Sequence, residues 1–419
     1  MPRSPLPRIP ASLHRRAVFA AVLLAAAIGF GGVAQAGSSA PAASDTAPSA
    51  PAAGWNTRLV HDLAQVSAGH SAGIGVYVRD LDTGVSARFQ SSESWYLAST
   101  VKVPVAIAVL RGIERGQYKL DTTVTLEASD YVDGAGLTNR NPVGSALSIR
   151  YLIEQMIVHS DNTASDMLIG LVGVDALNAL VAELVPQGFG RITRLAEVRR
   201  LAYGNLTPAA RRLSGRELIQ LNRQRSDADR MQMLSRFTGT PVAKFQLPSL
   251  EEAYDAYYAS GLNSARLDAY GELLARLAQG QALGPASTDY LLRVMERVAT
   301  GTHRIKAGLP PGVVFAHKTG TQRRRFCDAG IAYTPAAGAA TAAPTTPPHA
   351  GHPHRAVVVA CTRDELSLQR SELALRQIGA AVCRSGLVTQ GVVNAPSCPV
   401  VVAAVGGPAR LPADAAEER

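Results

Sequence analysis

Strand-forming residues concentrate near both ends of this 419-residue chain, and a long helix-forming stretch lies between them. Two β-branched runs, 74–80 and 85–89, are joined by a Leu-Asp-Thr-Gly turn and predict a hairpin. Three further strands are predicted near the other end, at 312–321, 325–334 and 355–362. A helix is predicted to follow them at 365–383. This order predicts one sheet assembled from both ends of the chain, with a helical portion inserted between its strands.

The first 36 residues have the composition of an export signal that is removed from the mature protein. Basic residues precede the apolar run 17–30, which is too short to span a bilayer comfortably, and Ala34-Gln35-Ala36 offers a small-residue cleavage site. We therefore expect cleavage near Ala36 and a periplasmic or secreted protein. The Ala/Ser/Pro-rich residues 37–54 predict a flexible linker.

The formal charge of the chain is +9, and excluding the four arginines of the signal leaves +5. Nucleic-acid binding needs a clustered basic face on a recognisable module, and the sequence has neither. No other apolar run has the length of a transmembrane helix, which predicts no stable membrane insertion after signal removal. We expect a monomer without a nucleic-acid partner.

A Ser-x-x-Lys sequence, Ser99 to Lys102, opens the apolar run 101–110. Residues three apart share one face of a helix, so the Ser99 hydroxyl and the Lys102 amine are predicted to be neighbours. A serine hydroxyl is a weak nucleophile near neutral pH and needs a base beside it. Pro104 is compatible with the first turn of a helix, which places the helix start near Ser99.

Two later segments strengthen this prediction. Ser-Asp-Asn at 160–162 follows an amphipathic run, and Lys-Thr-Gly at 318–320 ends a β-branched run that predicts a strand. Ser-x-x-Lys, Ser-Asp-Asn and Lys-Thr-Gly in this order are the three-motif signature of serine penicillin-recognising enzymes. Over about 55–386 the chain resembles the class A β-lactamase-related serine hydrolases of that family.

The resemblance implies a β-lactamase/transpeptidase-like fold of the α/β (α+β) class: an antiparallel five-stranded sheet from both chain ends, flanked by helices, with an inserted all-α portion. The predicted divisions are a catalytic domain at 55–386 and a C-terminal tail at 387–419. Within that domain, 55–90 and 300–386 form the α/β part and 91–299 the helical part. Residues 204–262 are an insert relative to the family, which either roofs the cleft and restricts substrate size or is a peripheral decoration.

The resemblance also implies roles in acylation. Ser99 would attack an amide or ester carbonyl and form an acyl-enzyme, with Lys102 as the base. Ser160 would pass a proton to the leaving nitrogen. The backbone N–H groups of Ser99 and Thr321 would bind the oxyanion.

The remaining motif residues would bind the substrate. Asn162 would hydrogen-bond the side-chain amide of the substrate and Lys102, while Asp161 braces its own turn. Lys318 and Thr319 would bind the substrate carboxylate. Gly320 would let the strand backbone approach the ligand closely.

The chain departs from the family at the residue that releases the product. Class A β-lactamases carry Glu-x-x-Leu-Asn after a Thr-Arg-Leu turn, and that glutamate activates the hydrolytic water. Here Thr-Arg-Leu stands at 193–195, but the glutamate position falls on Arg199, which cannot act as a base at neutral pH. Either the loop brings Glu197, two residues earlier, to the water, or fast deacylation by this route is absent.

All four cysteines lie in the last quarter of the chain, and export permits disulfides. We expect Cys327 to face Cys361 across adjacent strands, and Cys383 to tie the last helix to the tail through Cys398, although spacing alone leaves the pairing open. The spacings match no zinc pattern. The histidines of the loop 336–354 are predicted to be solvated, so neither a metal nor a cofactor is expected.

The leading interpretation is an exported serine acyl hydrolase that opens the amide of a small-molecule β-lactam through a Ser99 acyl-enzyme. A D-Ala-D-Ala carboxypeptidase or related penicillin-binding peptidase shares the motifs, does not require the loop glutamate and would act on a cell-wall peptide. A slowly deacylating β-lactam sensor, which acylates and stays acylated, is the third interpretation.

Overall fold

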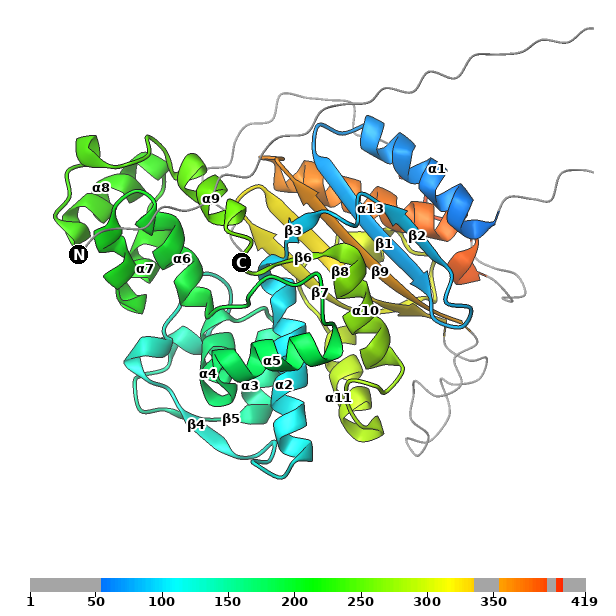
Figure 1. The fold of residues 1–419 in the computed structure, drawn as a ribbon, viewed down its shortest axis with the longest axis horizontal. Coiled ribbons are helices and arrows are strands. Elements are labelled where there is room, and N and C mark those ends of the chain that lie inside the picture. Colours follow the sequence, from blue (N-terminus) through cyan, green and yellow to red (C-terminus); the bar gives the residue numbers. More distant parts are fainter. Residues whose placement is uncertain (1–53, 335–353, 390–396, 402–419) are drawn as a thin grey trace, which may run out of the picture. The chain divides into compact units, whose positions relative to one another are not determined.

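The computed structural model describes residues 54–334, 354–389 and 397–401. The predicted signal peptide, nearly all of the predicted linker and most of the tail lie outside them. The central sheet has five antiparallel strands in the order β2-β1-β9-β8-β7, drawn from both ends of the chain as predicted (Figure 1). These strands are β1 (Gly73–Asp80), β2 (Ser86–Phe89), β7 (Val314–Gln322), β8 (Arg325–Tyr333) and β9 (Arg355–Arg363).

Alternating side chains of the sheet enter two different hydrophobic cores. Val76 and Val78 of β1 belong to the core that includes α1 (Trp55–Ala68) and α13 (Leu368–Arg384), which lie together on one face (Figure 1). Tyr77, between them, belongs to the core on the opposite side, where α10 (Leu267–Ala278) contacts β1 and β9. Because both faces are covered, the central strands are apolar almost throughout.

The helical part is built around α2 (Lys102–Glu114), in which every residue from Lys102 to Leu110 is buried. A 3₁₀ turn, Ala98–Val101, leads into α2, and Pro104 lies in its first turn, where proline is tolerated. Other helices of this part are α3 (Ile149–Val158), α4 (Asn162–Val172), α5 (Val174–Leu184) and α11 (Pro285–Glu296). The short α12 (Ile305–Gly308) lies outside it and contacts α13. Two short ribbons also occur, β3 (Ser94–Tyr96) with β6 (Ser264–Arg266) and β4 (Thr123–Thr125) with β5 (Ala146–Ser148).

Within the described ranges, no single helix is long and apolar enough to cross a bilayer. The helices α4 and α5 reach that length only as a pair, which is bent by 84° at its break. Leu168 of α4 and Leu177 of α5 are fully buried in the protein core.

The insert 204–262 forms helices with a hydrophobic core that they share with the preceding helix. The helices of the insert are α7 (Gly215–Asn222), α8 (Asp227–Thr238) and α9 (Leu250–Ala259), and the preceding helix is α6 (Leu195–Gly204). Ser214, Ser226 and Ser249 precede α7, α8 and α9, and each side chain accepts a backbone N–H from the first turn. Tyr254 and Tyr257 of α9 are buried in this core.

Both predicted disulfides are present. Cys327 and Cys361 stand directly opposite each other on β8 and β9, and Cys383 at the end of α13 is bonded to Cys398. The expectation of a solvated histidine loop is wrong for His354, which is 9% exposed and lies 3.3 Å from the Asp82 carboxylate. The other histidines of that loop lie outside the described residues.

Candidate active site

The Ser99 hydroxyl lies at the start of the buried helix α2, beside the Lys102 amine. Lys102 Nζ donates to Ser99 Oγ at 2.9 Å, as expected for residues one turn apart. The turn is held from outside, because Tyr270 OH donates to the Thr100 carbonyl at 2.8 Å. Ala98, just before the serine, has a φ of 46°, a conformation that non-glycine residues seldom adopt. Ser99 is therefore presented from a sharply turned and braced backbone.

The Ser160 hydroxyl lies between two lysine amines. Lys102 Nζ donates to Ser160 Oγ at 3.0 Å, and Lys318 Nζ donates to the same oxygen at 2.9 Å. Lys102 also donates to the Ser160 carbonyl and, at 2.7 Å, to Asn162 Oδ1. All three motifs thus meet in one hydrogen-bonded group, although they are far apart in the sequence.

Asp161 holds the turn between α3 and α4. Its Oδ1 accepts the N–H of Ala164 at 2.8 Å and so caps α4, and its Oδ2 accepts the N–H of Thr138 at 2.8 Å. Ser160 itself has a φ of 58°. The carboxylate therefore orients Ser160 and Asn162 on either side of it, in the bracing role that was expected.

The strand β7 closes tightly over the Ser99 turn. A Cβ atom on Gly320 would lie 2.5 Å from the Leu97 carbonyl oxygen and 3.2 Å from the Ser99 nitrogen. This contact between backbones accounts for the glycine, because any side chain would push the strand away from the serine. The sequence resemblance assigned Gly320 to close approach to a ligand, and the structure shows close approach to the turn that carries Ser99.

Arg304 is a buried cation that the sequence analysis missed. It donates to the Gly320 carbonyl at 3.0 Å and to Thr321 Oγ1 at 2.6 Å, and it is 3% exposed. Thr319 Oγ1 shares a hydrogen bond with Thr300 at 2.5 Å. Arg304 has no motif around it in the sequence, so only the fold reveals that it lies behind the Lys-Thr-Gly strand.

A pocket opens at Ser99. Its walls are formed by Tyr96, Ala98, Ser99, Val132, Asp133, Gly134, Asn162, Leu195, Val198, Arg199, Thr321 and Gln322. Lys102, Ser160 and Lys318 are fully buried beneath it. Of the predicted site residues, the pocket therefore exposes the serine, the asparagine and Thr321 to a ligand.

The structure does not bring Glu197 into this pocket. Its carboxylate accepts a hydrogen bond from Arg200 at 2.6 Å, and its side chain is 40% exposed. Val198 and Arg199, the next two residues of α6, line the pocket instead. Arg199 is 5% exposed, and its Nε donates to Asp133 Oδ2 at 2.8 Å.

Asp166 connects α4 to the start of the helix that carries Arg199. Its carboxylate accepts the N–H groups of Leu195 at 2.6 Å and Ala196 at 3.0 Å. Burial raises the pKa of Asp166 to about 6, against the opposing effect of these two hydrogen bonds. The position of α6 thus depends on a buried carboxyl group that titrates in the mildly acidic range.

Asp166 is expected to make stability depend on pH. Because folding raises its pKa, its contribution to the free energy of unfolding is fully present below a pH of about 4 and is lost as the pH rises through about 6. Asp166→Asn should flatten the pH dependence of that free energy over this range, measured by urea denaturation. Asp175→Asn, which changes an exposed carboxylate, serves as the control. A slope in Asp166→Asn equal to that of the wild type would contradict the assignment.

A buried serine beside a buried lysine, with a second serine and a strand lysine completing the group, defines a serine acyl-transfer site on a fold of penicillin-recognising type. The model of the β-lactamase enzyme family matches residues 58–384, and the chain belongs to this family. By family and fold it is a serine β-lactamase-related enzyme.

Individual relatives are distant. The chain is 31% identical over 200 residues to β-lactamase L2 of Stenotrophomonas maltophilia, covering 45% of this chain and 65% of that protein. It is 21% identical over 254 residues to β-lactamase VEB-1 of Pseudomonas aeruginosa, covering 60% and 67%. The alignments therefore span about two thirds of the length of these curated relatives. A solved PBP-A mutant, described as an acyl-enzyme complex with penicillin G, is 20% identical with a TM-score of 0.56 over 78% of this chain and 96% of that chain, which shows the shared fold.

Proposed function

We propose that this protein is an exported serine acyl hydrolase, of the class A type, that opens the amide of β-lactams through a covalent Ser99 intermediate. The observation that carries the proposal is the 2.9 Å hydrogen bond between Lys102 Nζ and Ser99 Oγ, because it pairs the nucleophile with a base. The named relatives are β-lactamases, and a structural neighbour is described as an acyl-enzyme with penicillin G.

Acylation follows from the arrangement of the hydrogen bonds. Ser99 Oγ attacks the β-lactam carbonyl, forming the Oγ–C bond, and the C–N bond of the ring breaks. The Ser99 proton passes to Lys102 in its neutral form, Ser160 delivers its own proton to the ring nitrogen, and Lys102 returns a proton to Ser160, to which it is hydrogen-bonded. Lys318 donates a hydrogen bond to Ser160 Oγ and so stabilises the negative charge that develops on this oxygen as Ser160 gives up its proton.

Substrate binding uses the edge of β7. The backbone N–H groups of Ser99 and Thr321 hold the oxyanion, and each such donor contributes about 3–4 kcal/mol in comparable sites. The family pattern assigns the substrate carboxylate to Lys318 and Thr319, which are buried beside Thr321, the residue of this strand segment that lines the pocket. The buried Arg304, which is paired with Glu372, donates to Thr321 Oγ1 and holds that residue in place. Asn162 binds the amide of the acyl side chain.

A second candidate function is favoured by the wall of the pocket. Glu197 is paired with Arg200 outside the pocket, and Arg199 stands where a water-activating carboxylate is expected from the family pattern. This arrangement supports either a D-Ala-D-Ala peptidase, which acts on cell-wall peptide and does not require the loop glutamate, or a β-lactam sensor that is acylated and stays acylated. The signal-like first 36 residues support export to the periplasm for either function.

The test is covalent labelling followed by turnover. After incubation with a penicillin, mass spectrometry should show one adduct, located on the Ser99 peptide. A chromogenic cephalosporin should then give steady hydrolysis if the protein is a β-lactamase, and a stoichiometric burst without a steady state if it is a sensor. Release of D-alanine from a muropeptide with negligible hydrolysis identifies the peptidase. No adduct with any β-lactam contradicts all the penicillin-based proposals.

A further inference from the structure

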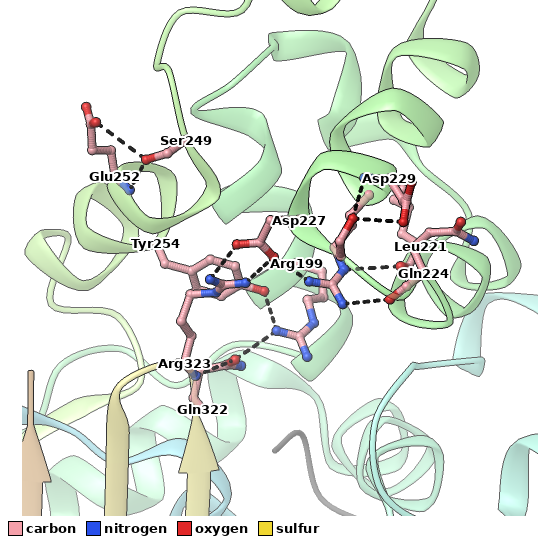
Figure 2. A network of polar contacts seen from close by, with 12 residues as sticks. Arg199, Leu221, Gln224, Asp227, Asp229, Ser249, Glu252, Tyr254, Gln322 and Arg323 are labelled. Atoms are coloured by element: carbon pink, nitrogen blue, oxygen red, sulfur yellow. Dashed lines mark hydrogen bonds and ion pairs between the residues drawn. The ribbon is translucent and has the colours of Figure 1, made fainter. Parts of the chain in front are cut away.

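Arg199 is held in the pocket wall by partners from three other segments. Its guanidinium donates to Gln322 Oε1 at 2.9 Å and to the Tyr254 hydroxyl (Figure 2). It also donates to Asp133 Oδ2 at 2.8 Å. These partners come from the loop after β4, from the end of β7 and from α9 of the insert. Arg199 and Asp133 are 5% and 3% exposed. The wall beside the serine is thus a buried ion pair braced by the insert.

Two helices of the insert fix the tyrosine that contacts Arg199. Arg323, next to Gln322, forms a two-pronged ion pair with Asp227 of α8, at 2.8 and 2.6 Å, and its guanidinium lies over the Tyr254 ring (Figure 2). Tyr258 of α9 donates to the Arg323 carbonyl at 2.8 Å. The insert is therefore attached to the edge of the pocket through Arg323, while the described residues that line the pocket all lie outside 204–262.

The carboxylate that is ion-paired with Arg199 belongs to Asp133. Among the described residues that line the pocket, it is the one with an acidic side chain. Its carbonyl accepts Asn162 Nδ2 at 2.7 Å, which fixes it beside the acyl-binding asparagine. A carboxylate hydrogen-bonded to a guanidinium is a weak proton acceptor, because the cation stabilises the charged form. Asp133 thus lines the same pocket as Ser99, and its carboxylate is engaged by Arg199.

We propose that the insert, acting through Tyr254 and Arg199, prevents Asp133 from serving as a base and so makes the Ser99 acyl-enzyme long-lived. The inference rests on the proposed function, since it concerns the second half of that reaction. In hydrolysis, water oxygen bonds to the ester carbon, a base takes a water proton, and the bond from carbon to Ser99 Oγ breaks as the serine regains a proton. Arg199 and Tyr254 are positioning residues: Tyr254 holds Arg199, and Arg199 keeps the Asp133 carboxylate in an ion pair, so that it does not take the proton from water.

The test compares how long the adduct survives in matched variants. A penicillin adduct is formed on wild type, Arg199→Met, Tyr254→Phe and Arg200→Met, excess drug is removed, and adduct loss is followed by mass spectrometry from pH 5 to 8. Arg199→Met should lose its adduct at least about tenfold faster, with a rate that rises with pH, because well-placed general bases contribute about 10²–10⁴-fold. Arg200→Met changes the neighbouring arginine of the same helix and should match wild type.

One further variant and the Tyr254→Phe variant distinguish release of the Asp133 carboxylate from a general loosening of the pocket wall. Arg199→Met combined with Asp133→Asn should return to the lifetime of the wild type, because the released base is gone. Tyr254→Phe removes one hydroxyl only and should shorten the lifetime about threefold, which keeps the test available if Arg199→Met fails to fold. Unchanged adduct lifetimes in both Tyr254→Phe and Arg199→Met would overturn the inference. Steady hydrolysis by wild type without an accumulated adduct would also overturn the inference and leave the proposed function standing, whereas absence of both adduct and hydrolysis would overturn the proposed function itself.

Discussion

Replacing Ser99 by alanine is expected to abolish covalent labelling by penicillin. The variant has no oxygen that can form an ester with the opened ring, whereas the Lys102, Ser160 and Lys318 hydrogen bonds to one another remain available. The initial rate at which the ring of a chromogenic cephalosporin is opened, in a burst or at steady state, should fall by at least about 10³-fold, since removal of the nucleophile leaves only binding and oxyanion stabilisation. Intact-protein mass spectrometry and initial rates measure the two effects.

Ser145→Ala provides the matched control for this change. Ser145 donates a hydrogen bond to the Pro142 carbonyl in a loop away from the pocket, so its loss should leave labelling and hydrolysis unchanged. Because the Ser99 side chain is small and the substitution removes a single oxygen, the melting temperature should change little. An adduct of full stoichiometry on Ser99→Ala would show that another residue is the nucleophile.

Replacing Lys102 by methionine is expected to slow acylation by at least about 10³-fold. Methionine has a similar length but cannot accept the Ser99 proton, so the hydroxyl keeps its ordinary weak nucleophilicity. The substitution also leaves the Ser160 carbonyl and Asn162 Oδ1 without their donor, which adds a cost in stability of about 1–3 kcal/mol. The rate of adduct formation measured by mass spectrometry and the free energy of unfolding measured in urea separate these two effects.

Lys119→Met, which removes an exposed lysine, is the control for the Lys102 variant. Raising the pH should not restore the rate of Lys102→Met if the amine is the base, because no other group in the bonded cluster takes its place. Acylation of Lys102→Met within about tenfold of the wild-type rate would contradict the role of the amine.

The reactive group could be predicted from the sequence because its members carry local signals. Ser-x-x-Lys at a helix start places Ser99 and Lys102 on one helix face whatever the remainder of the chain does. The β-branched run before Lys318 and the amphipathic run before Ser160 likewise define a strand and a helix by their own periodicity. Their meeting in one cluster came from the family resemblance, and the structure shows it as shared hydrogen bonds.

The pocket wall could not be predicted in this way. Asp133, Tyr254 and Gln322 are separated by long stretches of chain, and none stands in a motif, so no local pattern connects them with Arg199. The carboxylate of Glu197 faces Arg200, since both lie on one side of α6, and side-chain direction on a helix depends on where that helix is anchored. From the sequence, the insert was as compatible with a peripheral position as with one over the cleft, because composition does not indicate which segments its helices contact.

Most helices and strands of this protein, and its candidate nucleophile Ser99, could be read from the sequence, because periodicity, caps and short motifs act over a few neighbouring residues. Only the tertiary structure decided which charges meet at the pocket. It set Gly320 against the Ser99 turn, Arg304 behind β7 and Arg199 on Asp133. Such pairings depend on packing between distant segments, and a buried charge takes whichever partner the fold brings within reach.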